Sequence, residues 1–187
     1  MSPRANVRSN MVNGAIRLLA TEGVEGTSFK EVLALSDAPR GSVYHHFPGG
    51  KSELLHEALN RTSEFTLALL EPVRGQPAEV VLERFVELWR QLLQRSNLTA
   101  GCAIAAITVA GPETELLDHA GETFHVWTDR LAEFFAVGGM EEAAARQLSN
   151  LAIAATEGAV IMARAQRSMN PFEEVASALL HNVRAKT

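Results

Sequence analysis

Apolar residues recur at intervals of three and four along most of this chain, which is the spacing that gives an α-helix one apolar face. The interval is clear from residue 52 onward, for example in the stripe formed by Val81, Phe85, Leu88 and Leu92. No segment shows a convincing alternation of apolar and polar residues of the kind a half-buried strand has. The pattern therefore predicts an all-α protein of about nine helices.

Glycine and proline residues interrupt the helical pattern and mark where helices end. The segment 101–110 is short and apolar on every side, which predicts a helix buried in the middle of its domain. A long helix is predicted from Glu141 to about Arg167, and one further helix follows it. The interruptions lie at Gly75-Gln76-Pro77, Gly111-Pro112, Gly138-Gly139 and Asn170-Pro171.

The stretch 27–51 has the pattern of two short helices joined by a tight turn and followed by the start of a third. Ser28 with Glu31 three residues later forms a capping box, and Thr27 is an equally good cap. Ser36-Asp37 then stops the first helix and opens the turn. Two helices held crosswise by such a short turn are typical of a helix-turn-helix motif.

The second helix of this stretch is rich in polar side chains, with only Val43 and Phe47 as obvious core anchors. Arginine can donate two hydrogen bonds to guanine, serine can pair with several bases, and tyrosine and histidine reach phosphates or thymine methyl groups. A lysine at the start of the next helix favours a phosphate. The sequence therefore predicts a DNA-binding surface made of Thr27, Ser28, Arg40, Gly41, Ser42, Tyr44, His45, His46 and Lys51.

These residues resemble the DNA-binding domain of the TetR family of bacterial transcriptional regulators. The resemblance covers roughly the first third of the chain, from an opening helix over 7–22 to the lysine at 51. It implies that the residues nearest the bases are Arg40, Gly41, Ser42 and His45, and that Tyr44, His46 and Lys51 contact the DNA backbone. One subgroup of the family is similar in two further features, the insertion Gly49-Gly50 and the motif Gly101-Cys102.

The length of 187 residues suits one domain of ordinary size and a small appended one. We predict a DNA-binding domain over 1–51 and a helical ligand-binding and dimerisation domain over 52–187. One cysteine excludes an internal disulfide framework, and no apolar run is long enough to span a bilayer. These features indicate a cytoplasmic protein that does not bind a membrane.

The net charge of −5 is unevenly distributed along the chain. Residues 1–60 hold six basic and six acidic groups, so all of the excess negative charge lies beyond residue 60. Phosphate attraction depends on charge within about one Debye length, ~8 Å at physiological salt. A neutral domain with its basic groups on one face is therefore compatible with DNA binding that is strongly sensitive to salt.

Small residues cluster on the long helix after residue 141, at Ala152, Ala155, Gly158 and Ala159. They favour close approach of another helix, either inside the monomer or in a homodimer formed by the last two helices, as the family resemblance implies. We favour the dimer, because a palindromic operator requires two recognition helices about one DNA turn, ~34 Å, apart.

Large aromatic residues lie among small residues in the second domain and suggest a cavity for a small, mostly apolar ligand. The alternative for each of them is a place in the packed core, and for the cysteine a buried, inert thiol. The candidate ligand-binding residues are Phe85, Trp89, Cys102, Phe124, Trp127 and Met162.

The sequence holds no Gly-rich phosphate loop, no Gly-x-Ser-x-Gly elbow and no paired-cysteine motif. His45 and His46 are adjacent and point in different directions on a helix, so they do not predict a metal site. We therefore predict no enzyme, no cofactor and no metal, and a repressor that a ligand releases from operator DNA. The alternatives are a helical small-molecule-binding protein or enzyme without specific DNA binding, and a DNA-binding regulator that needs no ligand.

Overall fold

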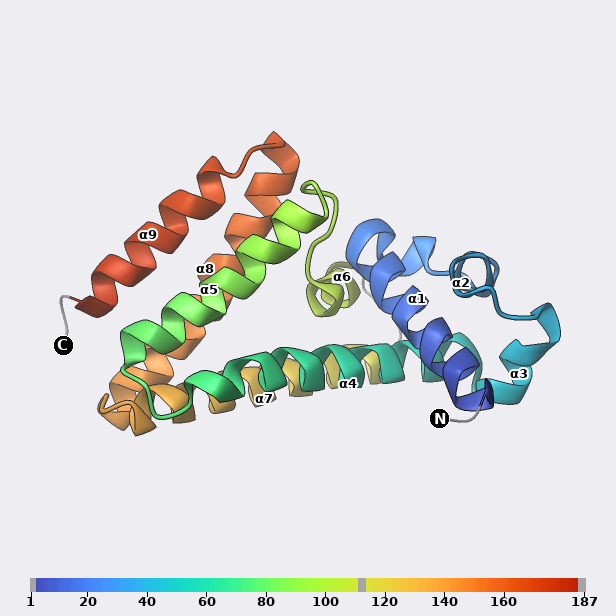
Figure 1. Ribbon diagram of the computed structural model, residues 1–187, viewed down its shortest axis with the longest axis horizontal. Coiled ribbons are helices and arrows are strands. Elements are labelled where there is room, and N and C mark those ends of the chain that lie inside the picture. The colour runs from blue at the N-terminus through green and yellow to red at the C-terminus, as the bar shows by residue number, and fades with distance from the viewer. Residues whose placement is uncertain (1–2, 111–113, 185–187) are drawn as a thin grey trace. The chain divides into compact units, whose positions relative to one another are not determined.

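The computed structural model describes residues 3–110 and 114–184, except for the side chains of residues 3–6 and Arg40 (Figure 1). Within those residues the chain forms nine α-helices and two short 3-10 helices, with no strand, which confirms the predicted all-α class. The predicted stop at Gly111-Pro112 lies outside the described residues. No helix of the described part combines the length and the apolar character that crossing a bilayer requires.

The chain divides into two compact units, each built from two separate stretches of sequence. The first unit comprises Met1–Glu64 and Cys102–Thr123, and the second comprises Phe65–Gly101 and Phe124–Thr187. The division predicted between residues 51 and 52 separates a DNA-binding part from a ligand-binding and dimerisation part, and this functional division stays a prediction.

The first unit contains the predicted helix-turn-helix. Helix α1 packs against α2 and α6, and apolar side chains of α1 and α4, among them Met11, Leu19, Leu54 and Leu59, are fully buried. Its elements are α1 (Pro3–Gly26), α2 (Phe29–Ser36), the 3-10 helix η1 (Arg40–Ser42), α3 (Val43–His46), most of α4 (Gly50–Leu70), α6 (Ala103–Ala110) and the start of α7 (Thr114–Val137).

Two predictions about this unit need correction or refinement. Helix α1 extends to Gly26, past the predicted end at Gly23. Gly23 itself has φ 72° and ψ −169°, so the regular helical conformation is interrupted there. Helix α6 is not buried on every side, because Val109 is 81% exposed and Ala110 is exposed as well. Apolar composition alone could not show that the last turn of α6 reaches the surface.

The second unit is a set of packed amphipathic helices. Helix α8 (Glu142–Gln166) packs against α9 (Asn170–Arg184), and α5 (Ala78–Arg95) packs against both. The end of α4, the larger part of α7 from Phe124 onward and the 3-10 helix η2 (Glu71–Val73) complete the unit. The observed bounds of α8 are within one residue of the predicted helix from Glu141 to about Arg167.

Candidate nucleic-acid interface and ligand region

The first helix of the motif begins and ends where the sequence predicts. Ser28 is the N-cap of α2, with its Oγ accepting a hydrogen bond from the backbone N–H of Glu31 at 3.2 Å. Asp37 ends the helix in the left-handed conformation, at φ 51° and ψ 27°. Short polar residues such as aspartate tolerate this conformation because their side chains hydrogen-bond locally. Local sequence therefore determines where α2 starts and where the chain turns.

The recognition segment is a 3-10 turn, η1, that continues directly into the single α-helical turn of α3. Ser42 stabilises the entry, since both its backbone N–H and its hydroxyl donate to the carbonyl of Pro39, at 2.9 and 2.6 Å. Val43 is 2% exposed and Phe47 is fully buried. The two residues predicted as anchors thus fix one face of the segment in the core.

The opposite face of the segment is open to solvent. Tyr44 is 75% exposed, and Gly41 and His45 are exposed as well. The centroid of the Tyr44 ring lies 6.3 Å from that of Phe29 in α2, and the ring centroids of His45 and His46 are 5.1 Å apart. Three polar or small positions are therefore presented on a segment whose other face is rigidly packed, as base or phosphate contact requires.

Two of the predicted DNA-binding residues, Thr27 and Lys51, make contacts within the protein instead of lying free on this open face. Thr27 is 1% exposed and its hydroxyl donates to the carbonyl of Gly23 at 2.7 Å, so it joins α2 to α1 and has no surface for DNA. The Lys51 ammonium donates to the carbonyl of Val24 at 2.7 Å, although two of its three N–H groups remain for another acceptor. The side chain of Arg40 lies outside the described residues.

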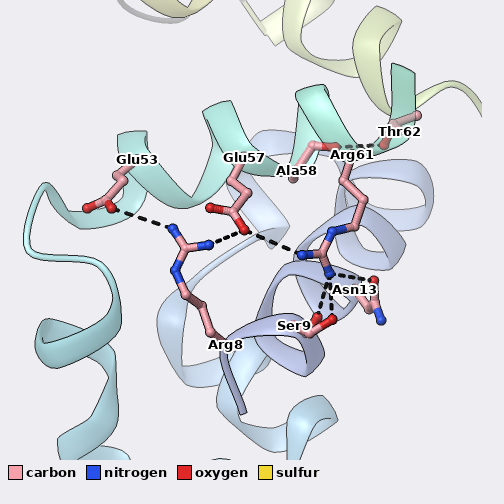
Figure 2. A network of polar contacts seen from close by, with 8 residues as sticks. All are labelled: Arg8, Ser9, Asn13, Glu53, Glu57, Ala58, Arg61 and Thr62. Atoms are coloured by element: carbon pink, nitrogen blue, oxygen red, sulfur yellow. Dashed lines mark hydrogen bonds and ion pairs between the residues drawn. The ribbon is translucent and has the colours of Figure 1, made fainter. Parts of the chain in front are cut away.

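A polar network that the sequence did not reveal joins α1 to α4 behind the motif (Figure 2). One guanidinium nitrogen of Arg61 donates to the backbone carbonyl and hydroxyl of Ser9, at 3.0 and 2.8 Å, and to Asn13 at 3.2 Å. Glu57 forms ion pairs with both Arg61 and Arg8. Of these contacts only the Glu57–Arg61 pair has a local signal, the spacing of four residues on one helix.

Arg8 also links this network to the recognition segment. Its guanidinium carbon lies 4.9 Å from the centroid of the Phe47 ring, within the range of a cation–π contact. The same side chain pairs with Glu57 and lies 3.8 Å from Glu53. The anchor of the recognition segment is therefore held by α1 and α4 together.

Four of the six candidate ligand residues form one aromatic cluster in the second unit. Trp89 contacts Phe85 and Trp127 edge-on, and Trp127 contacts Phe124 in the same way, with ring centroids 6.2 to 6.5 Å apart. Three of the rings are buried, and Phe124 is half-buried. Edge-to-face packing of this kind stabilises a core, and Phe124 gives the cluster an accessible edge.

The other two candidate ligand residues, Cys102 and Met162, are not members of this aromatic cluster. Cys102 is buried in the first unit, where its Sγ accepts a hydrogen bond from the backbone N–H of Ala105 at the start of α6, at 3.4 Å. Met162 is 49% exposed on α8. Sequence proximity and residue type could not separate these two positions from the four rings.

A hollow of about 430 Å³ in the second unit is lined by the α7–α8 turn and parts of α5, α8 and α9, and none of the four rings lines it. A second hollow, of about 560 Å³, lies in the first unit beside His56 and His119. Across residues 3–110 and 114–184, no three His, Cys, Asp or Glu side chains are grouped so that they could hold a metal ion.

Two family models match the chain over most of its length. Residues 12–58 match the model described as "Bacterial regulatory proteins, tetR family". Residues 77–178 match the model described as "Transcriptional regulator LmrA/YxaF-like, C-terminal domain". The first match contains the capped α2 and the recognition segment, and the second contains the aromatic cluster and α8.

Individual proteins are similar over nearly the whole chain. An uncharacterized HTH-type transcriptional regulator, Rv0196, of Mycobacterium tuberculosis strain H37Rv is 35% identical over 175 residues, covering 90% of this chain and 89% of that protein. The HTH-type transcriptional regulator LmrA of Bacillus subtilis strain 168 is 26% identical over 176 residues, covering 92% of this chain and 94% of that protein.

Solved structures share the fold. The regulatory protein TetR from Rhodobacter sphaeroides superposes with a TM-score of 0.83 at 15% identity, covering 94% of this chain and 97% of that chain. A TetR transcriptional regulator from Chloroflexus aurantiacus J-10-FL gives a TM-score of 0.80 at 21% identity, covering 98% and 97%. At these identities the similarity concerns the fold alone.

Proposed function

Because this chain belongs to the TetR family of bacterial regulatory proteins, and is therefore a DNA-binding transcriptional regulator and not an enzyme, we propose that it is a cytoplasmic repressor. It binds a palindromic operator as a homodimer, and a small, mostly apolar organic ligand releases it. The observation that carries this proposal is the recognition segment, anchored by Val43 and Phe47 and open at Gly41, Tyr44 and His45.

The exposure of Gly41, Tyr44 and His45 supports the proposed DNA contacts. Gly41 and His45, with Arg40 and Ser42, meet the base edges, and Tyr44, His46 and Ser28 meet the phosphates. Lys51 contributes its remaining N–H groups to a phosphate while it stays bound to Val24. Thr27 is not part of the proposed interface, because it is buried.

The proposed dimer uses an apolar stripe on α8 that the described monomer leaves exposed. Apart from the adjacent pair Ile161 and Met162, the residues follow one another three or four apart, so they share one broad face of the helix. Ala152 and Ala159, by contrast, are buried inside the unit. The stripe consists of Leu151, Ala154, Gly158, Ile161, Met162 and Ala165, and small residues at its centre allow a second helix to come close.

The proposed ligand binds beside the aromatic cluster, entering at the half-buried Phe124. The shift it causes in operator affinity is limited by its differential affinity for the two conformations of the dimer. Because Phe124 is half-buried, Phe124→Ala is expected to leave operator binding intact and to weaken release by an effector found in a compound screen. Retained release by the variant would remove the cluster from the proposal.

Selection of operator DNA from random-sequence pools tests the proposed function directly. We expect recovery of a palindrome whose two half-sites are about one helical turn apart, and whose affinity falls steeply with salt. Recovery of no sequence at low salt would favour the alternative of a helical binding protein without specific DNA recognition. A palindrome that no small molecule releases would favour a regulator that needs no ligand.

Tyr44→Phe is expected to weaken binding by about tenfold on the recovered palindrome and on random DNA alike, because it removes one hydroxyl contact to a phosphate, worth ~1.5 kcal/mol. His45→Ala is expected to weaken binding on the palindrome more than on random DNA. Fluorescence anisotropy on both probes measures the two losses. A sequence-selective loss for Tyr44→Phe would show that Tyr44 contacts a base.

A further inference from the structure

Two histidines in the first unit face each other across a contact that has no role in the proposed DNA or ligand sites. His56 on α4 and His119 on α7 meet through their Nδ1 atoms. Their rings are stacked, with centroids 4.7 Å apart and planes 16° apart. Both side chains are half-buried, so this contact is partly shielded from water.

The outer nitrogens of the two rings determine where the protons lie. His119 Nε2 is 2.8 Å from Oδ1 of Asn60, and because a carbonyl oxygen only accepts, His119 Nε2 must donate. A neutral His119 ring therefore presents an unprotonated Nδ1 to its partner. The proton in the contact comes from His56, and His56 Nε2 is buried without a hydrogen-bond partner, 3.9 Å from Glu115.

This arrangement accommodates one proton between the rings and has no place for a second. A proton on His119 Nδ1 would face the N–H of His56, and where His56 Nε2 is protonated as well, two imidazolium charges would stand in ring contact in a partly desolvated site. Burial lowers the pKa of His119, the neighbouring His56 lowers it further, and Glu122 opposes the shift in part. The geometry and the electrostatics thus favour the same state, in which His119 is neutral.

The charged groups around the pair are few among the described residues. From α7, the acidic residues Glu115, Asp118 and Glu122 line the adjoining hollow, and no lysine or arginine is among its walls. Helix α6 contains no ionisable side chain. On α4 the neighbouring Glu57 is engaged by Arg8 and Arg61. These carboxylates favour protonation nearby, while the ring contact itself excludes a second proton between the two imidazoles.

We propose that the His56–His119 pair is a pH-sensitive contact, which joins α4 to α7 near neutral pH, opens in mild acid and thereby weakens operator binding. Helix α4 transmits the change, because the same helix holds α1 through Arg61, which bonds Ser9, and through Glu57, which pairs with Arg8 (Figure 2). Opening the contact removes a restraint that α7 places on α4 within this unit.

The sign follows from proton binding. Because the pKa of His119 lies below its ordinary value of 6.5 in the folded protein, the unfolded chain binds more protons as the pH falls below that value. The contribution of the pair to stability is therefore complete above about pH 6.5 and is lost progressively as the pH falls through the folded pKa.

Two measurements test the contact without DNA. Imidazole NMR titration of the full-length protein should show His119 protonating below the ordinary pKa value of 6.5, with the His56 resonances changing in the same pH range. Thermal unfolding between pH 7.5 and pH 5.5 should show a loss of stability that is smaller in His119→Gln and unchanged in the control His125→Gln. Independent titration of the two rings, or an equal loss in His119→Gln, would overturn the proposal.

A third measurement tests the link to DNA, which rests on a palindrome recovered as described above. Because the proposed DNA interface itself contains His45 and His46, the informative quantity is the ratio of operator affinities at pH 7.5 and pH 5.5, compared between variants. We expect a several-fold larger ratio for the natural chain than for His119→Gln, with His56→Gln as a second variant if His119→Gln does not fold. Equal ratios would overturn the proposed coupling, whereas failure to recover any palindrome bears on the proposed function alone.

Discussion

Phe47→Ala is expected to lower the free energy of unfolding of the first unit by about 3–5 kcal/mol, the usual cost of removing a large buried aromatic side chain. Phe47 is fully buried, closes α3 through the hydrogen bond from its backbone N–H to Val43 at 2.8 Å, and supports the guanidinium of Arg8. The loss is large against a typical total of about 5–15 kcal/mol. Operator binding should therefore fail at physiological temperature even though Phe47 itself is buried.

Urea unfolding followed by circular dichroism measures the loss, and hydrogen exchange of the α1 and α2 amides assigns it to the first unit. Phe65→Ala is a matched control, because Phe65 is 64% exposed and its removal should change stability little. Phe47→Leu should cost less than the alanine variant, since it leaves a smaller cavity. Equal stabilities for Phe47→Ala and Phe65→Ala would mean that Phe47 does not anchor the recognition segment.

Gly158→Glu is expected to abolish the dimer and to reduce operator affinity by about 100-fold or more, because two linked recognition segments gain roughly this factor over one. Gly158 is exposed, and no atom lies within 4 Å of the position that its Cβ would take. The monomer therefore accommodates the substitution. In the proposed dimer, the carboxylate would be buried without a partner in the middle of the α8 stripe, which costs several kcal/mol.

Analytical ultracentrifugation gives the oligomeric state, and anisotropy on the recovered palindrome gives the affinity. Gly121→Glu is the matched control, since Gly121 also lies within a helix and also has no atom within 4 Å of a Cβ position. The control should remain dimeric. A dimeric Gly158→Glu that still binds the palindrome tightly would place the dimer interface elsewhere on the chain.

Much of the motif could be predicted because its signals are local. The cap at Ser28, the turn at Asp37 and the anchors Val43 and Phe47 depend on residues within a few positions of each other, and the structure confirms each of them. Thr27 shows the limit of this reasoning. Its side chain is equally suited to capping α2, to phosphate contact and to bonding the carbonyl of Gly23, and only the path of α1 selects the last of these.

The candidate ligand residues show the same limit, and their role in binding a ligand stays a prediction. Helical spacing correctly grouped aromatic residues on inward-facing stripes, and the structure brings four rings together across α5 and α7. Spacing on a single helix does not say which neighbouring helix that stripe meets. Cys102 and Met162 were included on residue type, and in the structure Cys102 belongs to the first unit while Met162 is 49% exposed on α8.

The sequence by itself determined the helices, their ends and the composition of the recognition segment, because capping, turn chemistry and apolar spacing act between residues that are close along the chain. Only the tertiary structure decided which side chains meet across helices. Arg61 reaches Ser9, Arg8 reaches the ring of Phe47, and His56 meets His119 over sequence separations that carry no local signal. Contacts of that kind depend on how helices pack, and packing is a property of the whole folded unit.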